Sequence, residues 1–345
     1  MEQGFGAMGL SAFYGSASKE EEEKIGVLKA AVEKGVTIIN SAVFYGPLHE
    51  EGYGDNLRLL AKALQSGLDR EKVQLMVKVG MDTRATVDKP GTQWKVASTA
   101  EEIRADVELA LQILGVDCLD IAVLCRVPTE VGIEIPIAEL AELVKEGKVK
   151  HIGVSEASPE NIRRAHAVHP LLCIEEEWSL WTREIEEGIV PTCAELGIAI
   201  VAYSPLGRGF LTGTLRSRTD PAFSAHDFRL HMYPRMSEKA FDENLKLVDG
   251  LKPICEARGC SQSQLALAWL QSQGRKFGVR VVPIPGTSKL AHLEENLAAR
   301  NMLITAEEDA AIEAIFDKNI EKRLGTRYAH MALCWETQVG NTASH

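Results

Sequence analysis

Short apolar segments alternate with longer amphipathic segments along most of the chain. Continuous apolar runs are typical of strands that are buried on both faces of a parallel sheet. The glycine-rich residues 4–10 are expected to form a weaker strand at the start. The other predicted strands are residues 36–40, 73–79, 118–124, 151–154, 173–177, 198–203 and 279–283.

Helix start and stop signals lie between these runs. Capping boxes, in which a Ser or Thr and a Glu three residues later bind each other's backbone N–H, are expected at 18–21, 99–102 and 305–308. Gly35 and Gly115 are expected to end the first two of these helices. Helical periodicity predicts further helices over 137–148 and 262–273, and the polar stretch 216–239 is expected to be a long loop.

The repeated strand–helix pattern fits a closed (β/α)8 barrel or an open, doubly wound sheet. The length of 345 residues and the unbroken repeat favour the barrel, a TIM barrel of the α/β class. No linker separates two halves. We therefore expect one barrel domain over residues 1–345, with a C-terminal tail from about residue 318.

Composition narrows the classes of partner and compartment. The 38 Lys and Arg against 49 Asp and Glu give a net charge of −11, which argues against binding nucleic acid or an anionic membrane. The 7 cysteines form no C-x-x-C pair, so we expect neither a disulfide framework nor a zinc site. No apolar run approaches the ~18 residues of a membrane-spanning helix, and the first residues do not resemble a secretory signal. A cytoplasmic protein is expected.

Two glycine-containing motifs could bind phosphate. Gly4, Gly6 and Gly9 match G-x-G-x-x-G, but residues 11–15 do not begin a helix, so a strand end with close backbone approach is favoured over a dinucleotide fingerprint. Residues 283–289 run from a strand into a helix expected near residue 290, where free N–H groups could face an anion. With residues 204–209 they would form a phosphate site at the barrel rim, although a capped helix and an ordinary turn are the alternative.

A lysine and a tyrosine follow or end predicted strands. Lys78 lies within the apolar run LMVKV, and a buried lysine needs either a charged partner or a function. At the C-terminal end of a barrel strand it would point into a site. Tyr45 follows the strand at 36–40 and taken alone would be a packed aromatic residue.

These motifs together resemble the aldo-keto reductases, most closely the branch of plant, fungal and bacterial reductases, over nearly the whole chain. The segments that carry the resemblance are residues 6–11, 45–46, 78, 155–158, 177–180, 203–209 and 282–287. The resemblance implies a (β/α)8 barrel that binds NADP(H) in extended form at its C-terminal rim, without a Rossmann domain. It also implies reduction of an aldehyde or ketone to the alcohol by hydride transfer.

The family uses an Asp, Tyr, Lys and His tetrad, and two of these positions differ here. The resemblance places the Tyr at Tyr45 and the Lys at Lys78, while the Asp position is Asn40 and the His position is Cys125. A phenol with a pKa near ~10 needs a cation beside it, which Lys78 can supply. Asn40 can orient Lys78 but adds no charge, so Lys78 is expected to be less neutralised. Cys125 is a poor donor, and a lost donor can cost ~10²–10³ in rate; His49 is a less favoured substitute.

The same resemblance assigns the cofactor-binding positions. Ser155 and Glu156 would face the nicotinamide amide, and Tyr203 would stack on its ring. Glu175 stands at the family's Gln position, where a carboxylate would favour the oxidised, cationic cofactor; a solvated Glu in the run 175–177 is the alternative. Further contacts are expected from Met8, Gly9, Ser204, Leu206, Gly207, Arg208 and Gly286, from Ser288 and Lys289 to the 2′-phosphate, and from Glu295 and Asn296 to the adenine. These positions favour NADP(H) over NAD(H).

The expected protein is thus an NADP(H)-dependent reductase of a small carbonyl compound, with a specialised biosynthetic role as one option. The alternative is a catalytically impaired barrel that senses NADP(H) or binds a partner, because Asn40 and Cys125 depart from the tetrad. Residues 216–239 and 327–335, including Tyr328, His330, Met331 and Trp335, are expected to shape the substrate pocket. The sequence gives no indication of oligomeric state.

Overall fold

Eight parallel strands form a nearly closed barrel at the centre of the computed structural model, which describes residues 2–12, 20–47, 52–84, 94–220, 223, 227–316, 323–329 and 334–338. The strands are β1 (Phe5–Gly6), β2 (Ile38–Ala42), β3 (Gln74–Val79), β6 (Leu119–Leu124), β7 (Val149–Ser155), β8 (Leu171–Glu177), β9 (Ala199–Tyr203) and β10 (Val281–Pro283), paired in that order. The Gly4 N–H donates to the Pro283 carbonyl at 2.9 Å and joins the last strand to the first. The predicted (β/α)8 fold is confirmed.

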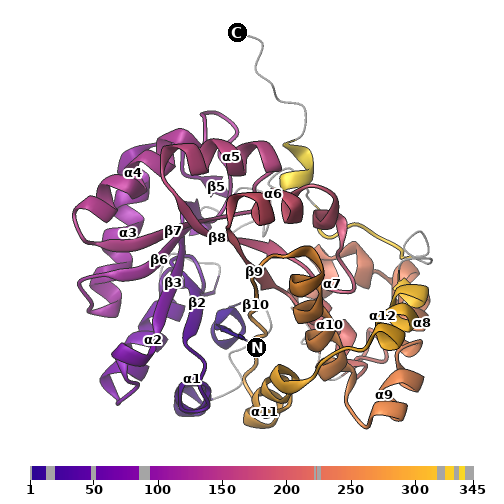
Figure 1. Cartoon of the computed structure of the whole chain (residues 1–345). Coiled ribbons are helices and arrows are strands. Elements are labelled where there is room, and N and C mark those ends of the chain that lie inside the picture. Colours follow the sequence, from indigo (N-terminus) through magenta and orange to yellow (C-terminus); the bar gives the residue numbers. More distant parts are fainter. Residues whose placement is uncertain are drawn as a thin grey trace.

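Helices surround the strands (Figure 1). Between successive strands lie α1 (Glu21–Glu33), α2 (Asp55–Gln65), α3 (Ala100–Leu114), α4 (Glu134–Lys145), α5 (Pro159–Val168), α6 (Ile189–Leu196) and α10 (Gln262–Phe277), and α11 (Leu290–Ala298) follows β10. Additional helices α7 (Phe228–Met232), α8 (Glu238–Asp249) and α9 (Lys252–Arg258) precede α10, and α12 (Ala306–Phe316) comes last. Within the described parts of the chain, no helix combines the length and apolarity needed to cross a membrane.

The local signals in the sequence account for most element boundaries. The capping box at Thr99 is formed, and Gly115 ends α3 in a left-handed conformation with φ 66°. Thr305 and Glu308 bind each other's backbone N–H groups at the start of α12. Gly35 follows α1 with φ 84°. The first part of the box predicted at 18–21 lies outside the described residues.

Three segments differ from the prediction. The strand expected over 4–10 is short, because Met8–Leu10 forms a 3-10 turn. The loop expected over 216–239 includes α7 and a second 3-10 turn, Pro234–Met236. A two-stranded antiparallel hairpin, β4 (Met81–Asp82) with β5 (Lys95–Val96), was not predicted, since strands of this length leave no periodic pattern.

Close backbone approach explains two of the glycines at the rim and was predicted for the first of them, Gly6. A Cβ atom on Gly6 would lie 2.7 Å from the Ile284 carbonyl oxygen, and a Cβ atom on Gly286 would lie 2.4 Å from the Gly6 carbonyl oxygen. Any other residue at these positions would force β1 and the segment after β10 apart.

The barrel interior is built in layers. An apolar cluster in the interior contains Met76, Ile121, Val123, Cys173, Val201 and Ile284, with Ile38 packed against it. Because side chains alternate along a strand, positions two residues further on face the same interior, one layer nearer the C-terminal rim. From Ile38, Met76, Val123, Cys173 and Val201 this step reaches Asn40, Lys78, Cys125, Glu175 and Tyr203.

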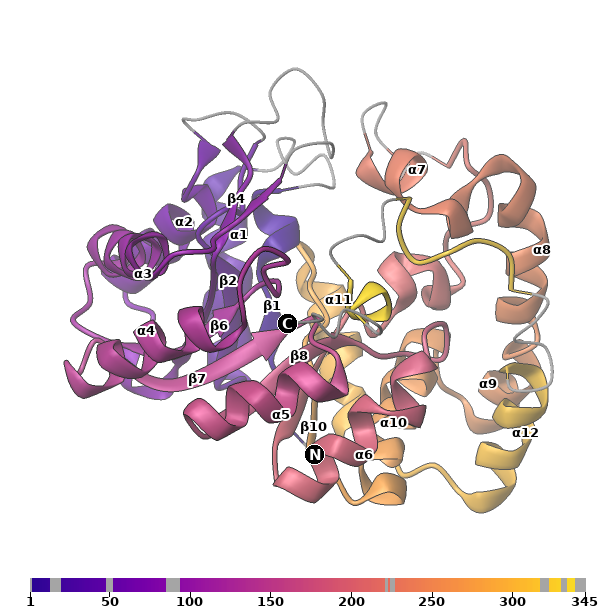
Figure 2. The same ribbon diagram turned by 90° about the horizontal axis from the view of Figure 1, so that it is seen from above.

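The described C-terminal segments 323–329 and 334–338 lie across this rim. Asn244 of α8 bonds the backbone N–H and carbonyl of Leu324, and the Ala329 N–H donates to the Met232 carbonyl at 3.0 Å. Figure 2 shows residues 323–329, in yellow, running beside α7. These described segments therefore cover part of the barrel mouth.

Candidate active site

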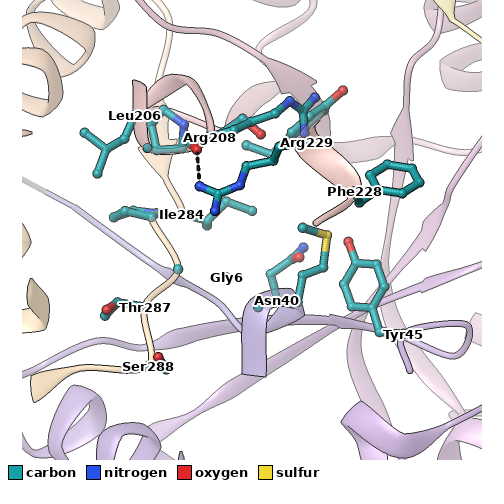
Figure 3. Close-up of a pocket in the computed structure, with 18 of the residues that line it drawn as sticks. Gly6, Asn40, Tyr45, Leu206, Arg208, Phe228, Arg229, Ile284, Thr287 and Ser288 are labelled. Carbon is teal, nitrogen blue, oxygen red and sulfur yellow. Dashed lines mark hydrogen bonds between the residues drawn. The ribbon is translucent and has the colours of Figure 1, made fainter. Parts of the chain in front are cut away.

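One cavity of about 570 Å³ opens at the C-terminal ends of the strands. In Figure 3, Asn40 and Tyr45 face it on one side, with Leu206, Arg208 and Ile284 opposite and Thr287 and Ser288 at one end. Most residues predicted for the site line it, namely Met8, Gly9, Asn40, Tyr45, Lys78, Cys125, Ser155, Glu175, Tyr203, Ser204, Leu206, Arg208, Gly286, Ser288, Lys289, Glu295 and Asn296. Glu156 and Gly207 are buried behind its wall and do not line it.

Lys78, Asn40 and Glu175 form a closed triangle of hydrogen bonds from three different strands. The Lys78 ammonium donates to Asn40 Oδ1 and to Glu175 Oε1, each at 2.7 Å. The Asn40 amide Nδ2 donates to the other carboxylate oxygen, Glu175 Oε2, also at 2.7 Å. All three residues are at most 3% exposed, so bulk water does not screen this arrangement.

The charge of Lys78 is balanced by Glu175. Burial alone would lower the pKa of Lys78, but the Glu175 carboxylate, together with Tyr45 and Cys125, raises the pKa above its ordinary value. Lys78 is therefore an ammonium ion at neutral pH. This corrects the expectation that Asn40 leaves Lys78 less neutralised: the carboxylate that β2 lacks is supplied by β8, across the barrel interior.

Tyr45 lies against this ammonium. The Lys78 nitrogen is 5.0 Å from the centre of the Tyr45 ring, and the ammonium also hydrogen-bonds the phenol. Burial raises the pKa of Tyr45; Lys78 opposes this effect and Glu175 adds to it. The phenol consequently holds its proton at neutral pH and can donate it.

Cys125 and Arg126 complete this end of the cavity. Cys125 follows β6 directly, its N–H donates to the Val79 carbonyl at 2.9 Å, and burial raises the pKa of its thiol. The thiol is thus neutral. The Arg126 guanidinium donates to the Cys125 carbonyl at 2.9 Å and lies 3.7 Å from its sulfur. Arg126 was not among the predicted site residues, although its place after a strand-end site residue was a usable signal.

The run Glu175, Glu176 and Glu177 is buried, which corrects the alternative of a solvated run. Glu177 accepts a hydrogen bond from Arg208 at 2.7 Å. Glu176 accepts the Ala157 N–H at 2.9 Å. Burial and the nearby Glu156 raise the pKa of Glu176 well above its ordinary value, which keeps that acid protonated.

Glu156 is held by the C-terminal segment. Arg327 donates to both of its carboxylate oxygens, at 2.9 and 2.8 Å, and to both oxygens of Glu336. Burial alone would raise the pKa of Glu156, but the Arg327 charge and hydrogen bonds lower it to about 2. Tyr203 also donates to Glu156, at 2.5 Å, and its hydroxyl lies 2.9 Å from that of Tyr328.

The predicted C-terminal contribution to the pocket is confirmed for one residue. Tyr328 lines the cavity, whereas Trp335 does not. His330, Met331 and the substitute donor His49 lie outside the described residues. Phe228, Arg229 and Tyr233 line the cavity and fall within the segment 216–239 that was expected to shape it, although they were not predicted individually. Trp94 also lines the cavity and was not predicted. Arg229 donates to the Arg208 carbonyl at 3.1 Å (Figure 3).

Backbone strain gathers at the same rim. In the described chain, the non-glycine residues with positive φ are Glu156 at 54°, Ser204 at 46° and Arg208 at 58°. Glu156 and Ser204 each follow a barrel strand directly. Such conformations cost of order 1–3 kcal/mol each and persist where the surrounding structure enforces them, which is typical of binding and active sites.

The opposite end of the cavity has the chemistry of an anion site. Lys289, whose N–H donates to the Thr287 hydroxyl at 3.0 Å, precedes α11, and Ser288 lies beside it. His292 and Lys24 also line this cavity. The donor set fits an extended dinucleotide, because hydroxyl and cationic groups occupy one end and the Tyr45–Lys78 pair the other end of a single cavity.

Known proteins share both this fold and this sequence pattern. A glycerol dehydrogenase from Gluconobacter oxydans matches with a TM-score of 0.79 at 24% identity, over 92% of this chain and 91% of that one. A thermostable aldo-keto reductase solved with the inhibitor epalrestat matches with a TM-score of 0.68 at 24% identity, over 91% and 94%. These likenesses show the fold.

The sequence comparisons show the family. Over 296 residues the chain is 42% identical to "Probable aldo-keto reductase 1" of Glycine max, which covers 86% of this chain and 80% of that protein. Residues 3–317 match the model of the Aldo/keto reductase family. The barrel, the rim cavity and these matches lead to one conclusion: the chain belongs to the aldo/keto reductase family.

Proposed function

We propose that this chain is an NADP(H)-dependent reductase that converts an aldehyde or ketone to the alcohol. The family typically reduces small carbonyl compounds with NAD(P)H. The observation that supports activity in this chain is the Lys78 ammonium, which is held by Asn40 and Glu175 and hydrogen-bonds the Tyr45 phenol.

Tyr45 is the proton donor in this proposal. When bound, the reduced nicotinamide supplies the hydride to the carbonyl carbon. Tyr45 gives its proton to the carbonyl oxygen, so that the alcohol forms and a phenolate remains. Burial disfavours that phenolate, and Lys78, whose charge is the nearest cation, stabilises it.

Glu175 acts through Lys78 as a positioning residue. A buried ammonium without a carboxylate would lose its proton or unfold the site, since desolvation of an unpaired charge is costly. Asn40 then fixes the carboxylate through its amide, at 2.7 Å from Oε2. Because Lys78 neutralises Glu175, the carboxylate has less charge left to favour a cationic, oxidised nicotinamide than its sequence position suggested.

The cofactor-binding positions follow the cavity wall. Lys289 and Ser288 would hold the 2′-phosphate, Glu295 and Asn296 the adenine, and Arg208 and its neighbours the pyrophosphate. Ser155 and Tyr203 line the end nearest Tyr45 and would position the nicotinamide. The cation at residue 289 favours NADP(H) over NAD(H).

Cys125 supports a second candidate, a barrel that binds NADP(H) and senses it or binds a partner without catalysing reduction. A neutral thiol is a weak donor, so the carbonyl oxygen lacks a strong second hydrogen bond. The Lys78–Glu175 pair argues for the enzyme, because a binding module has no need of a buried ammonium beside a protonated phenol.

NADPH oxidation against a panel of aldehydes and ketones separates the two candidates. We expect turnover by the wild-type protein and a loss of about 10²–10⁴ in kcat for Tyr45→Phe, the contribution typical of a general acid. NADPH affinity, measured by quenching of protein fluorescence, should stay unchanged in Tyr45→Phe. NADPH binding without turnover on the whole panel would favour the binding module.

A further inference from the structure

We propose that Arg126 binds an anionic group on the substrate, so that the preferred substrates are carbonyl compounds that carry a carboxylate. The proposal rests on the reductase function given above and specifies its substrate class. It concerns the Tyr45 end of the cavity, where Arg126 and Cys125 line the wall together.

Arg126 differs from the other arginines that line the cavity in lacking a carboxylate partner. Arg208 pairs with Glu177 and Arg229 pairs with Asp227, each at 2.7 Å. Arg126 makes no ion pair with any described residue, and its hydrogen bonds within the described chain go to the carbonyl and sulfur of Cys125. A guanidinium has five N–H donors, so most of its capacity faces the cavity unused.

The surrounding groups leave this charge available. Lys78 neutralises Glu175. Glu156 interacts with Arg126 through its charge, but Arg327 binds both of its carboxylate oxygens, and the described residues contain no Arg126–Glu156 ion pair. The pKa of the Cys125 thiol and that of the Tyr203 phenol are both raised by burial, so neither supplies a negative charge at neutral pH. A planar, charged fork in a shielded cavity matches the geometry of a carboxylate.

Arg126 is also separate from the cations expected to hold the cofactor phosphates. It follows β6, the fourth strand in the order of the sheet, whereas Lys289 follows β10, the eighth. In a closed barrel of eight strands these positions are on opposite sides. One anion cannot bridge both cations, so Arg126 faces a different ligand group. Its sequence neighbour Cys125 interacts with Lys78 and with the Tyr45 phenol that would protonate the carbonyl.

Matched pairs of aldehydes test this specificity. The probes are 2-, 3- and 4-carboxybenzaldehyde, each with the carbamoylbenzaldehyde of the same shape and no charge. For the best acid of the set, we expect Arg126→Met to lower kcat/KM by about 10- to 100-fold, the range of a charge-assisted hydrogen bond, and to leave the matching amide little changed. Arg126→Lys should retain part of the preference. Arg163→Met, which removes an exposed arginine paired with Glu195, is the control and should change kcat/KM for neither the acid nor the amide.

A binding measurement keeps the test independent of turnover. Benzoate and benzamide have no reducible carbonyl, and their affinities are measured by calorimetry with NADP⁺ present. Wild type should bind benzoate at least about tenfold more tightly than benzamide, and Arg126→Met should abolish that difference. Thermal unfolding shows whether the variants are folded. If Arg126→Met does not fold, the preference of the wild-type protein for benzoate over benzamide still tests the proposal.

The outcomes separate the two proposals. Equal binding of benzoate and benzamide by wild type, or equal loss for acids and amides in Arg126→Met, would overturn the anion site while leaving the reductase intact. Arg126-dependent benzoate binding without reduction of any aldehyde would refute the reductase and retain the anion site.

Discussion

The Lys78 ammonium lies 2.7 Å from Glu175 Oε1, which places the carboxylate partner of the lysine on β8. By family resemblance an acid was expected on β2 and an amide on β8, and this chain has Asn40 on β2 and Glu175 on β8. The amide and the acid have therefore exchanged strands relative to the family pattern. In this chain the Asn40 amide donates to the Glu175 carboxylate at 2.7 Å. The buried charge of Lys78 is balanced from the other side of the barrel interior.

Exchanging the two groups back tests this compensation. Glu175→Gln leaves the Lys78 ammonium with two amides, so we expect a loss of about 3–5 kcal/mol in the free energy of unfolding and a fall in kcat. The double variant Asn40→Asp/Glu175→Gln restores one carboxylate beside Lys78. It should recover most of the lost stability and most of the lost kcat. Urea unfolding and NADPH oxidation measure the two effects.

Asn40→Asp alone is the matched control for this exchange. It puts two carboxylates on one ammonium, and like charges at hydrogen-bond distance oppose ionisation. We expect Asn40→Asp to be less stable than wild type, so that each single variant is less stable than the double variant. Additive effects of the two changes would show that Asn40 and Glu175 act independently and would refute the compensation.

Cys125→His should raise activity. An imidazole N–H at this position would hydrogen-bond the carbonyl oxygen, and a donor of this kind is worth about 10²–10³ in rate when the geometry is good. The larger ring must fit beside Arg126, so we expect a gain of at least about tenfold in kcat. The kcat of Cys125→Ala should stay close to that of wild type, because the neutral thiol contributes little to the reaction. A tenfold loss of kcat in this variant would show that the thiol itself takes part.

Periodicity in the sequence was sufficient to predict the barrel, because runs such as 198–203 are apolar throughout and are separated by helices with explicit caps. The same alternation, with inward positions two residues apart, places Lys78 and Cys125 in one layer. It was not sufficient to predict how the side chains of that layer pair. The link between Asn40 and Glu175 spans 135 positions in the sequence and depends on barrel closure.

The irregular rim was the least predictable part. The hairpin of β4 and β5 contains strands too short for a period-2 pattern, and Arg327 reaches Glu156 from a segment with no periodicity at all. Contacts of this kind depend on how loops pack over a finished barrel. A charged residue without a periodic context, such as Arg126 two positions after the end of β6, is the signal in the sequence that could have predicted these contacts.

Glu176 and its neighbour Glu177 should respond in opposite ways to replacement by Gln. The pKa of Glu176 is raised, so its protonated form is the native one, and stability is lost as pH rises above about 4.5 towards the raised value. Glu176→Gln cannot ionise and so does not lose stability in this way. Its free energy of unfolding relative to wild type should therefore grow by about 1.4 kcal/mol per pH unit between about pH 4.5 and the raised pKa. Glu177→Gln instead breaks the contact with Arg208 and should destabilise the protein at neutral pH. Urea unfolding between about pH 5 and pH 8 distinguishes them.

Arg327→Met tests the attachment of the C-terminal segment. The folded-state pKa of Glu156, about 2, lies below its ordinary value, so the Arg327–Glu156 pair stabilises the fold above about pH 4.5 and loses this effect as pH falls towards 2. We expect the variant to be about 3–5 kcal/mol less stable at pH 7, because a buried carboxylate loses its cation, and the deficit to shrink steadily in acid. Arg163→Met removes an exposed pair with Glu195 and should change the free energy of unfolding little at any pH. A deficit of Arg327→Met that is the same at pH 7 and pH 3 would mean that packing of the arginine stem, and not its charge, holds the segment against the barrel.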